Sequence, residues 1–512
     1  MDQGTGAGVA RHYEPQLRRS FGAVGNAILT LSAMSPATTV FVYVSVLFFL
    51  VGTWSFPATV IAAFIAAGMS LVYAELGTAY PIAGGEYAII GRVLGRGTGF
   101  IVFVVLLLFY TLLIASFALG AGLQLQTIWA TVDPRLAGLV LLVLAAGLTI
   151  LRVRTSWIVT TAMLAVELVS IGIVSFLGFA HAQDPIGRLI VPKAFIPSGG
   201  AAPITWSILL LGLTLAFFNM TGFNVSVLFS EETEKARKRV GRAVMLAVAV
   251  FVFVVIVPTA AALMGAPSLR GLSTSPSAMV YVTKALGGER LGTFITLAIV
   301  VAIFNALVAN IMGFGRVLWS GARDQVLPQP VNGWLEAVHR RFRTPWVACL
   351  VMAAAGGASL FSAAITGLVT LMGVITLVFM GLMCVSAIRI RLMRDAPRRY
   401  LMPLWPFVPV AVLASFVLMA TGQTAHDLVI VLLTAAGAGV YYLAYLRPRS
   451  ATKWVMLGAV EEPEEWSGTA APGEALKVMR PGAAPEPLPS ATTLEPAQSG
   501  AALDALPEAA EG

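Results

Sequence analysis

The chain has 512 residues, of which 58% are hydrophobic and only 11% are charged, and its mean hydropathy is +0.86. So much apolar surface cannot be buried in one or two water-soluble domains, and the composition therefore indicates an integral membrane protein. The net charge of +8 does not indicate nucleic-acid binding, because no folded basic domain stands apart from the apolar stretches.

Twelve stretches of the chain are long and apolar enough, or nearly so, to cross a membrane as helices, which takes about 20 mostly apolar residues. In chain order they are 21–49, 57–80, 98–124, 136–151, 157–180, 204–229, 243–265, 291–317, 346–362, 365–388, 402–420 and 428–446. The polar residues 1–20 do not resemble a removable signal peptide, so the first span is expected to remain as an anchor. The expected fold class is all-α and membrane-embedded, with twelve transmembrane helices.

The Lys and Arg residues are distributed unevenly between the loops. If the twelve spans alternate and the N-terminal segment 1–20 lies inside, 27 of the 33 fall on the cytoplasmic side. The six on the other side are Arg135, Arg188, Lys193, Arg270, Lys284 and Arg290. This asymmetry obeys the positive-inside rule and predicts a multi-pass protein of the cytoplasmic membrane with both termini in the cytoplasm.

The first span contains the polar sequence LSAMSPATTVF, in which Ser35 and Pro36 precede Thr38 and Thr39. Proline lacks a backbone donor and clashes with the preceding helical turn, so the helix is expected to kink or unwind here. Taken alone, the pattern is at least as typical of an ordinary proline kink in a membrane helix.

Two acidic residues lie inside predicted spans. Glu75 is near the cytoplasmic end of the second span, where its carboxylate can reach water or pair with a loop arginine, so we favour a structural role. Glu167 lies near mid-bilayer in the fifth span, where a charge costs from about 3 to more than ~10 kcal/mol. Its carboxyl is expected either to carry a proton in a proton-coupled carrier or to be a neutral, hydrogen-bonded structural group.

The sixth span holds a second polar interruption, in which Gly222 lies between the amides of Asn219 and Asn224. A glycine hinge among polar side chains predicts another break in the helix. The two interruptions lie five spans apart, so each opens a block of five helices, and the two blocks run in opposite directions. Paired broken helices in inverted repeats point to a solute site near the middle of the membrane in a secondary transporter.

The predicted organisation is therefore a repeat at 21–180, an inverted repeat at 204–388 and two further helices at 402–446. In the eighth span, Asn305 and Asn310 are turned about 140° from each other on a helix, so they cannot both face one small site. One is expected to serve a site and the other to join helices.

The segment 447–512 is rich in Pro, Ala, Gly and Glu and is expected to be a disordered cytoplasmic tail. Cys349 and Cys384 fall inside predicted spans, and the four histidines have no metal-ligand spacing, so we expect no disulfide, metal or cofactor. These patterns disfavour an enzyme such as a membrane-embedded transferase. An ion channel is disfavoured because neither charge rings nor a repeated filter loop is present.

Four segments resemble the amino acid-polyamine-organocation (APC) permeases, and the likeness spans roughly residues 20 to 445. They are LSAMSPATTVF in the first span, YAELGTAYPIAGGEYAIIGRVLG from the second, MTGFNVSVLFSEETEKARKRVGRAV from the sixth and GFGRVLWSGARDQVLP at the end of the eighth. The third and fourth of these segments are the specific ones.

This resemblance implies a LeuT-like fold in which the first and sixth spans unwind around the substrate. It also implies transport of amino acids, polyamines or related amines, driven by protons, exchange or sodium. By position, backbone amides at Ser35 to Thr39 would meet a carboxylate, and Phe218 falls where the family often has an aromatic gate. Glu167 falls at the cation site and would be faced by Asn305, while Asn310 would lie nearer the substrate.

The chain departs from the family pattern at two of these positions. The sixth span has Gly222-Phe223-Asn224 where relatives commonly have Gly-Phe-Glu, and the usual glycine of the first span is replaced by Thr39. Loss of the carboxylate at Asn224 removes an anion that could attract a cationic side chain, which argues against a polyamine or arginine carrier.

The function predicted from the sequence is secondary transport of an amino acid, expected to be neutral, either by exchange or by proton symport through Glu167 with Asn305 beside it. An amine, polyamine or organic-anion permease of the same fold is the alternative. The expected partners are a small-molecule substrate, protons and the lipid bilayer, without nucleic acid. The residues expected to bind substrate are Ser35, Ala37, Thr38, Thr39, Phe218, Asn219, Thr221, Gly222, Asn224 and Asn310.

Overall fold

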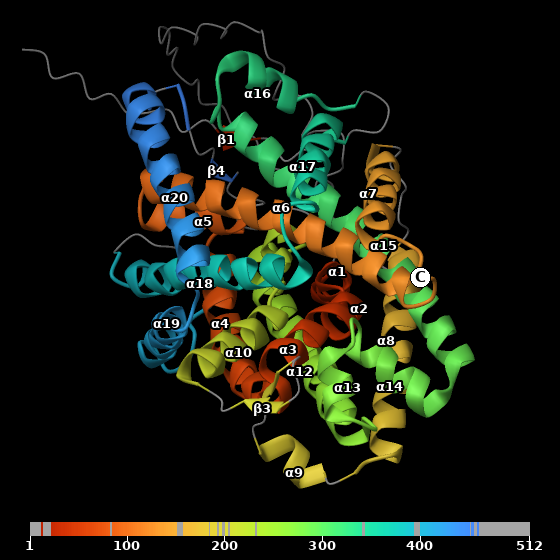
Figure 1. Cartoon of the computed structure of the whole chain (residues 1–512). Helices are drawn as coiled ribbons and strands as arrows, with labels where there is room; N and C mark the ends of the chain where they lie inside the picture. Colours follow the sequence, from red (N-terminus) through yellow and green to blue (C-terminus); the bar gives the residue numbers. More distant parts are fainter. Residues whose placement is uncertain are drawn as a thin grey trace, which may run out of the picture. The chain divides into compact units, whose positions relative to one another are not determined.

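A computed structural model describes residues 12–13, 22–81, 84–150, 157–183, 185–191, 194–196, 200–202, 205–230, 233–339, 344–393, 400–450, 452–454 and 458–459. Of the predicted N-terminal segment 1–20, the structure describes residues 12–13. Of the predicted tail 447–512, it describes residues 447–450, 452–454 and 458–459. Within the described residues the chain is almost entirely helical (Figure 1), which agrees with the expected all-α class.

Helices correspond to every predicted span. In chain order they are α1 (Ala23–Met34), α2 (Pro36–Thr38), η1 (Thr39–Tyr43) and α3 (Val44–Val51) for the first, then α4 (Ser55–Ala79), α6 (Arg96–Gln126), α7 (Pro134–Ile150), α8 (Trp157–Ala180), α10 (Trp206–Asn219) with α11 (Val225–Leu228), α12 (Ala236–Gly265), α15 (Glu289–Arg323), α17 (Trp346–Ser359), α18 (Ile365–Ile390), α19 (Phe407–Ala420) and α20 (Ala425–Tyr441).

The connections carry shorter elements. These are α5 (Gly85–Val93), α9 (Pro185–Ile190), α13 (Leu269–Thr274), α14 (Ala278–Gly287), α16 (Gln329–Leu335), η2 (Gly52–Trp54), η4 (Tyr442–Leu446) and η5 (Arg447–Arg449). Two strand pairs are also present, β1 (His12–Tyr13) parallel to β4 (Gly458–Ala459) and β2 (Ala194–Ile196) antiparallel to β3 (Gly200–Ala202).

Seven stretches of the described chain are long and apolar enough to cross a membrane, judged by length and composition. The first of them, Ala23–Ala79, runs through two predicted spans, and the shorter apolar helices α7, α10, α17 and α19 match four more. The structure therefore supports a multi-pass membrane protein. The number of twelve crossings stays a prediction.

The first span is broken after α1, where the sequence predicted an interruption. Ser35 has a left-handed backbone, with φ of 48°, and its hydroxyl accepts a hydrogen bond from the Thr38 amide at 3.3 Å. A serine N-cap followed by proline at the first helical position is a favourable helix start, so Ser35 and Pro36 begin α2 directly after the break.

The sixth span is broken between α10 and α11, where Gly222 predicted it. Gly222 has φ of +108°, which favours glycine, and a Cβ at this position would lie 2.7 Å from Cγ of Met34. Met34 is the last residue of α1. Both predicted interruptions are therefore confirmed, and the two broken helices touch where each is interrupted.

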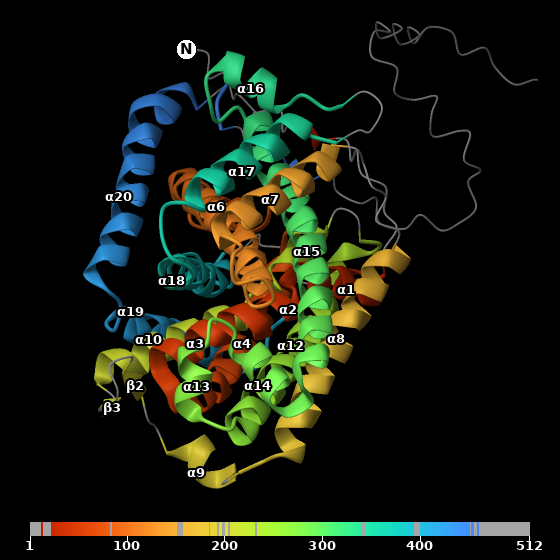
Figure 2. The same ribbon diagram turned by 45° about the vertical axis from the view of Figure 1, so that its right-hand side comes forward.

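The helix contacts repeat with a fixed offset of five predicted spans. α4 packs against α12, α6 against α15, and α7 against α17. In the same way, α1 packs against α12 as α10 does against α4, and α8 packs against α12 as α18 does against α4. Exchange of the first five predicted spans with the next five maps the first three contacts onto themselves and exchanges the two members of each later pair. In Figure 1 α1 and α2 lie near the centre, and in Figure 2 α20 and α8 lie at opposite edges.

The first residues of the predicted tail pack against the helices, which differs from the expected disorder. Trp454 is buried, and its Nε1 donates a hydrogen bond to the backbone oxygen of Arg96 at 2.9 Å. Its ring also packs against Tyr87, Phe100 and Phe103. The prediction of disorder rested on the average composition of the tail. Burial of the single large aromatic ring of Trp454 orders the residues around it.

Candidate functional site

A cavity of about 50 Å³ lies where the two broken helices meet, with room for a few water molecules. Its walls come from both breaks and from α6, α15 and α18. Of the predicted residues, those that line it are Thr39, Phe218, Thr221, Gly222, Asn224 and Asn310. None of its lining side chains is charged, so a solute with a charged side chain would find no counter-ion in this wall.

Aromatic rings form much of the remaining wall. Phe218, at the end of α10, packs against Tyr43 with ring centroids 5.3 Å apart and against Phe109 at 6.3 Å. Tyr110 is stacked on Phe314 at 4.0 Å, and its hydroxyl has no hydrogen-bond partner among the described residues. The sequence singled out Phe218 and gave no signal for the other rings.

Four predicted residues are buried but do not line the cavity: Ser35, Ala37, Thr38 and Asn219. The hydroxyls of Ser35 and Thr38 lie 2.9 Å apart and bond to each other. Neither polar atom of the Asn219 amide has a partner within the described part of the chain. In this structure these four residues therefore lie behind the cavity wall.

The amides that follow the first break are already occupied. The Ala37 amide donates to Oε2 of Glu167 at 3.0 Å, the Thr38 amide to the Ser35 hydroxyl, and the Thr39 amide to the Ser35 carbonyl at 3.1 Å. The resemblance to the permease family implied that these amides would be open to a solute carboxylate. In this structure such a carboxylate would have to displace Glu167 or the Ser35 hydroxyl.

Glu167 joins the middle of α8 to the first break. Its side chain is 1% exposed, and its Oε1 has no partner among the residues that the structure describes. Asn305 is partly exposed and makes no described hydrogen bond to it. Asn310, by contrast, lines the cavity and donates from Nδ2 to the carbonyls of Ala33 at 3.2 Å and Ala306 at 2.8 Å.

One acidic residue beside the cavity was missed by the sequence reasoning. Glu86, in α5, is 1% exposed, and its Oε1 accepts hydrogen bonds from Nδ2 of Asn224 at 2.6 Å and from the Tyr73 hydroxyl at 3.1 Å. Glu86 lies in a connection outside the predicted spans, where the local sequence does not indicate that an acidic side chain is buried. Asn224 replaces the family carboxylate, as the sequence analysis stated, but the carboxylate of Glu86 lies directly behind it.

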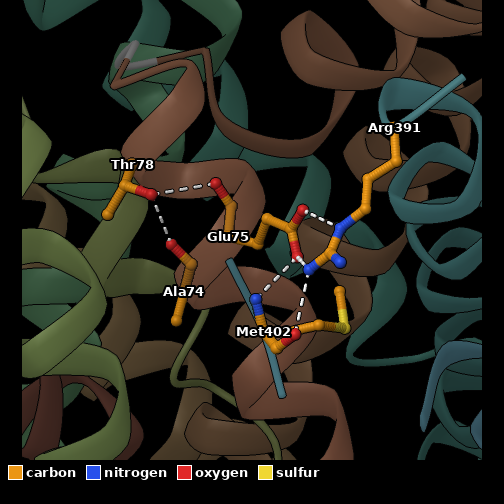
Figure 3. Close-up of polar contacts among 5 residues, drawn as sticks. All are labelled: Ala74, Glu75, Thr78, Arg391 and Met402. Carbon is orange, nitrogen blue, oxygen red and sulfur yellow. Dashed lines mark hydrogen bonds and ion pairs between the residues drawn. The ribbon is translucent and has the colours of Figure 1, made fainter. Parts of the chain in front are cut away.

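Glu75 pairs with a loop arginine, as one of its two predicted options stated. Its carboxylate meets Arg391 in two hydrogen bonds, at 2.7 Å to Nε and 2.8 Å to Nη2, and accepts a third from the Met402 amide at 3.0 Å (Figure 3). Arg391 also donates to the Met402 carbonyl at 2.9 Å. The group fastens α4 to the end of α18 and to the segment before α19, which is a structural role.

Comparison with known proteins identifies related sequences over most of the chain. A model of the family described as amino acid permease matches residues 19–442. An uncharacterized transporter of Mycobacterium tuberculosis is 26% identical over 405 residues, which cover 79% of this chain and 87% of the relative. The serine/threonine exchanger SteT of Bacillus subtilis is 24% identical over 73% of this chain and 84% of its own. The branched-chain amino acid permease BcaP of Lactococcus lactis is 25% identical over 68% and 77%.

Proposed function

This chain belongs to the amino acid permease family, and from that premise we propose that it is a secondary transporter that carries a neutral amino acid across the cytoplasmic membrane. The observation that carries the proposal is the cavity at the meeting of the two breaks, whose lining is polar in places and nowhere charged. The related exchanger and permease named for serine, threonine and branched-chain amino acids agree with a neutral solute.

The two predicted inverted repeats are part of the proposal. The offset of five spans in the helix contacts supports them, because a structure built from two related halves pairs equivalent helices in this way. Inverted repeats around a fixed site allow the site to open to either side of the membrane by rocking one group of helices against the other. α19 and α20 are additions outside the repeats.

We propose that Glu167 couples a proton to solute binding through the Ala37 amide. While Glu167 is ionised, it accepts the hydrogen bond of that amide at 3.0 Å, and charged acceptors hold such bonds strongly. Protonation weakens the bond and releases the amide for the carboxylate of the solute. Proton and solute would then bind together and leave together.

A cationic amine is the second candidate solute, and Glu86 is the observation that favours it. Its carboxylate lies 2.6 Å from the Asn224 amide, one side chain behind the cavity wall. A negative charge this close would attract a cation. The uncharged lining argues more directly for a neutral solute, because a solute touches the lining first.

Uptake by the purified full-length chain in liposomes tests these proposals. The panel contains neutral, cationic and anionic amino acids and polyamines, each with and without an inward proton gradient. We expect neutral amino acids to enter and the gradient to increase their uptake. Glu167→Gln keeps an acceptor for the Ala37 amide but cannot change charge, so its uptake should not respond to the gradient.

Each part of the proposal has its own contradicting result. A gradient response that survives Glu167→Gln would remove the coupling role of this residue. Preferred uptake of polyamines would replace the neutral amino acid with the second candidate. Uptake of no amine-bearing solute at all would contradict the proposed function itself.

A further inference from the structure

Glu86 and Asn224 form a buried contact at the edge of the cavity. Glu86 comes from α5, in the connection between α4 and α6, and Asn224 directly precedes α11. Their side chains meet at 2.6 Å, and the Tyr73 hydroxyl donates to the same carboxylate oxygen at 3.1 Å. The other carboxylate oxygen of Glu86 has no hydrogen-bond partner among the described residues.

This contact decides which end of the Asn224 amide faces a solute. A carboxylate oxygen only accepts hydrogen bonds, so it must face the amide nitrogen of Asn224. Asn224 also lines the cavity, and no described residue donates to its Oδ1. The carbonyl oxygen is therefore the acceptor that Asn224 offers to a solute.

The other polar groups of the cavity wall are the hydroxyls of Thr39, Tyr43, Tyr110 and Thr221 and the amide of Asn310. The Thr221 hydroxyl donates to the Phe218 carbonyl at 2.7 Å, which leaves its oxygen able to accept a hydrogen bond. Phe314, Phe379 and Val225 are apolar. What distinguishes Asn224 from these groups is that a buried carboxylate, Glu86, fixes the direction of its amide.

We propose that Glu86 is a positioning residue that holds Asn224 with its carbonyl oxygen toward the cavity, and that this oxygen selects amino acids whose side chain donates a hydrogen bond. The solute class is a small neutral amino acid with a hydroxyl group. An aliphatic side chain of equal size would leave the oxygen without a partner, and an unpaired buried acceptor is unfavourable. The inference rests on the proposed function and specifies the substrate class of the same cavity.

Threonine and valine test this inference because they have nearly the same shape and differ by a hydroxyl in place of a methyl. The measurement is the ratio of their concentrations that halve uptake of a labelled transported amino acid into liposomes. We expect threonine to compete about tenfold better than valine in the unchanged chain, the size of effect that one neutral hydrogen bond supports. The ratio does not depend on how much of the protein is active.

Four variants distinguish positioning from general damage. Glu86→Gln retains an acceptor for Nδ2 of Asn224 and should keep the ratio, whereas Glu86→Leu frees the amide and should reduce it to about twofold. Asn224→Leu removes the oxygen itself and should abolish the preference, even if Glu86→Leu does not fold. Tyr73→Phe removes the second donor to Glu86 without touching Asn224, and serves as the matched control with an unchanged ratio.

The outcomes separate this inference from the proposed function. If amino acids enter but threonine and valine compete equally in the unchanged chain, the selection is overturned and the transport function stands. If Asn224→Leu keeps the preference, or Glu86→Gln loses as much of it as Glu86→Leu, the positioning role is overturned. If no amino acid enters, both proposals fail together.

Discussion

Gly222 is the residue at which the two broken helices touch. Its φ of +108° is unfavourable for any residue with a side chain, and a Cβ would lie 2.7 Å from Cγ of Met34. Gly222→Ala is therefore expected to lower the free energy of unfolding by about 1–3 kcal/mol and to abolish most of the uptake, because the end of α1 must move away. Thermal unfolding in detergent and uptake at equal protein amounts check this.

Gly147→Ala is the matched control for that change. Gly147 lies inside α7, and a Cβ there would meet nothing within 4 Å. Alanine within a helix is better than glycine by about 0.5–1 kcal/mol, so stability should be kept or rise. Equal losses in both variants would contradict a special role for Gly222.

A second prediction at the scale of residues concerns the contribution of the Glu75–Arg391 ion pair to stability. The side chains are 6% and 17% exposed, so removal of one partner leaves the other charge poorly hydrated. Glu75→Gln should lower the free energy of unfolding by about 3 kcal/mol, measured by unfolding in detergent. Glu234→Gln breaks a pair with Arg239 whose side chains are 53% and 33% exposed, and should cost less than about 1 kcal/mol. If both variants lose less than about 1 kcal/mol, the Glu75–Arg391 pair does not stabilise the fold as proposed.

Single residues could be predicted from the sequence where their own chemistry decides the outcome. Pro36 and Gly222 disturb a helix through their own backbones, so the local sequence indicates where each interruption lies. Glu86 could not be found in this way, because its partner Asn224 lies 138 residues further along the chain. Only folding brings the two together, and neither residue carries a local signal for the other.

At the scale of elements, Asn26 joins α1 to α11, which are each one half of a broken helix. Its Nδ2 donates to the Ser226 carbonyl at 3.1 Å and to the Thr233 hydroxyl at 2.8 Å, and its Oδ1 accepts from the Ser226 hydroxyl at 2.8 Å. α11 has only four residues, too few to hold a helical shape without tertiary contacts. Asn26 therefore makes α1 and α11 one unit.

Asn26→Leu is expected to separate this unit. The buried groups left without partners should lower the free energy of unfolding by about 2 kcal/mol, and the maximal uptake rate should fall more than the apparent affinity, because the halves no longer move together. Thr30→Val is the control, since Thr30 donates to Asn26 from within α1 at 3.1 Å and leaves the link to α11 intact. Equal loss of the maximal rate in both variants would contradict the link.

The long helices could be predicted from the hydropathy of the chain, whereas the short helices could not. Each predicted span has its helix because an apolar run near 20 residues carries its own signal. α13 and α14 were not predicted, since their position depends on contacts such as the Ala278 amide donating to the Ser45 hydroxyl at 2.9 Å. Such helices are held by the surrounding fold, which composition does not record.

For the whole molecule, the repeated helix contacts and the paired breaks both agree with two equivalent blocks of five helices. The order of apolar spans predicted two blocks of five helices, and the contacts between α4 and α12 and between α6 and α15 agree with equivalent places in each block. The walls of the cavity come from both blocks. A movement of one block against the other would therefore change access to the cavity without dismantling it.

Protection of a single cysteine tests the location of the solute most directly. The native Cys349 and Cys384 are buried, so Thr221→Cys would place a reactive thiol in the cavity wall against a low background. An amino acid that the chain transports should slow the labelling of this thiol by a water-soluble maleimide, and should not slow it in Glu234→Cys at the exposed surface. Labelling of Thr221→Cys that is unchanged at saturating amounts of a transported amino acid would contradict a solute site at the two broken helices.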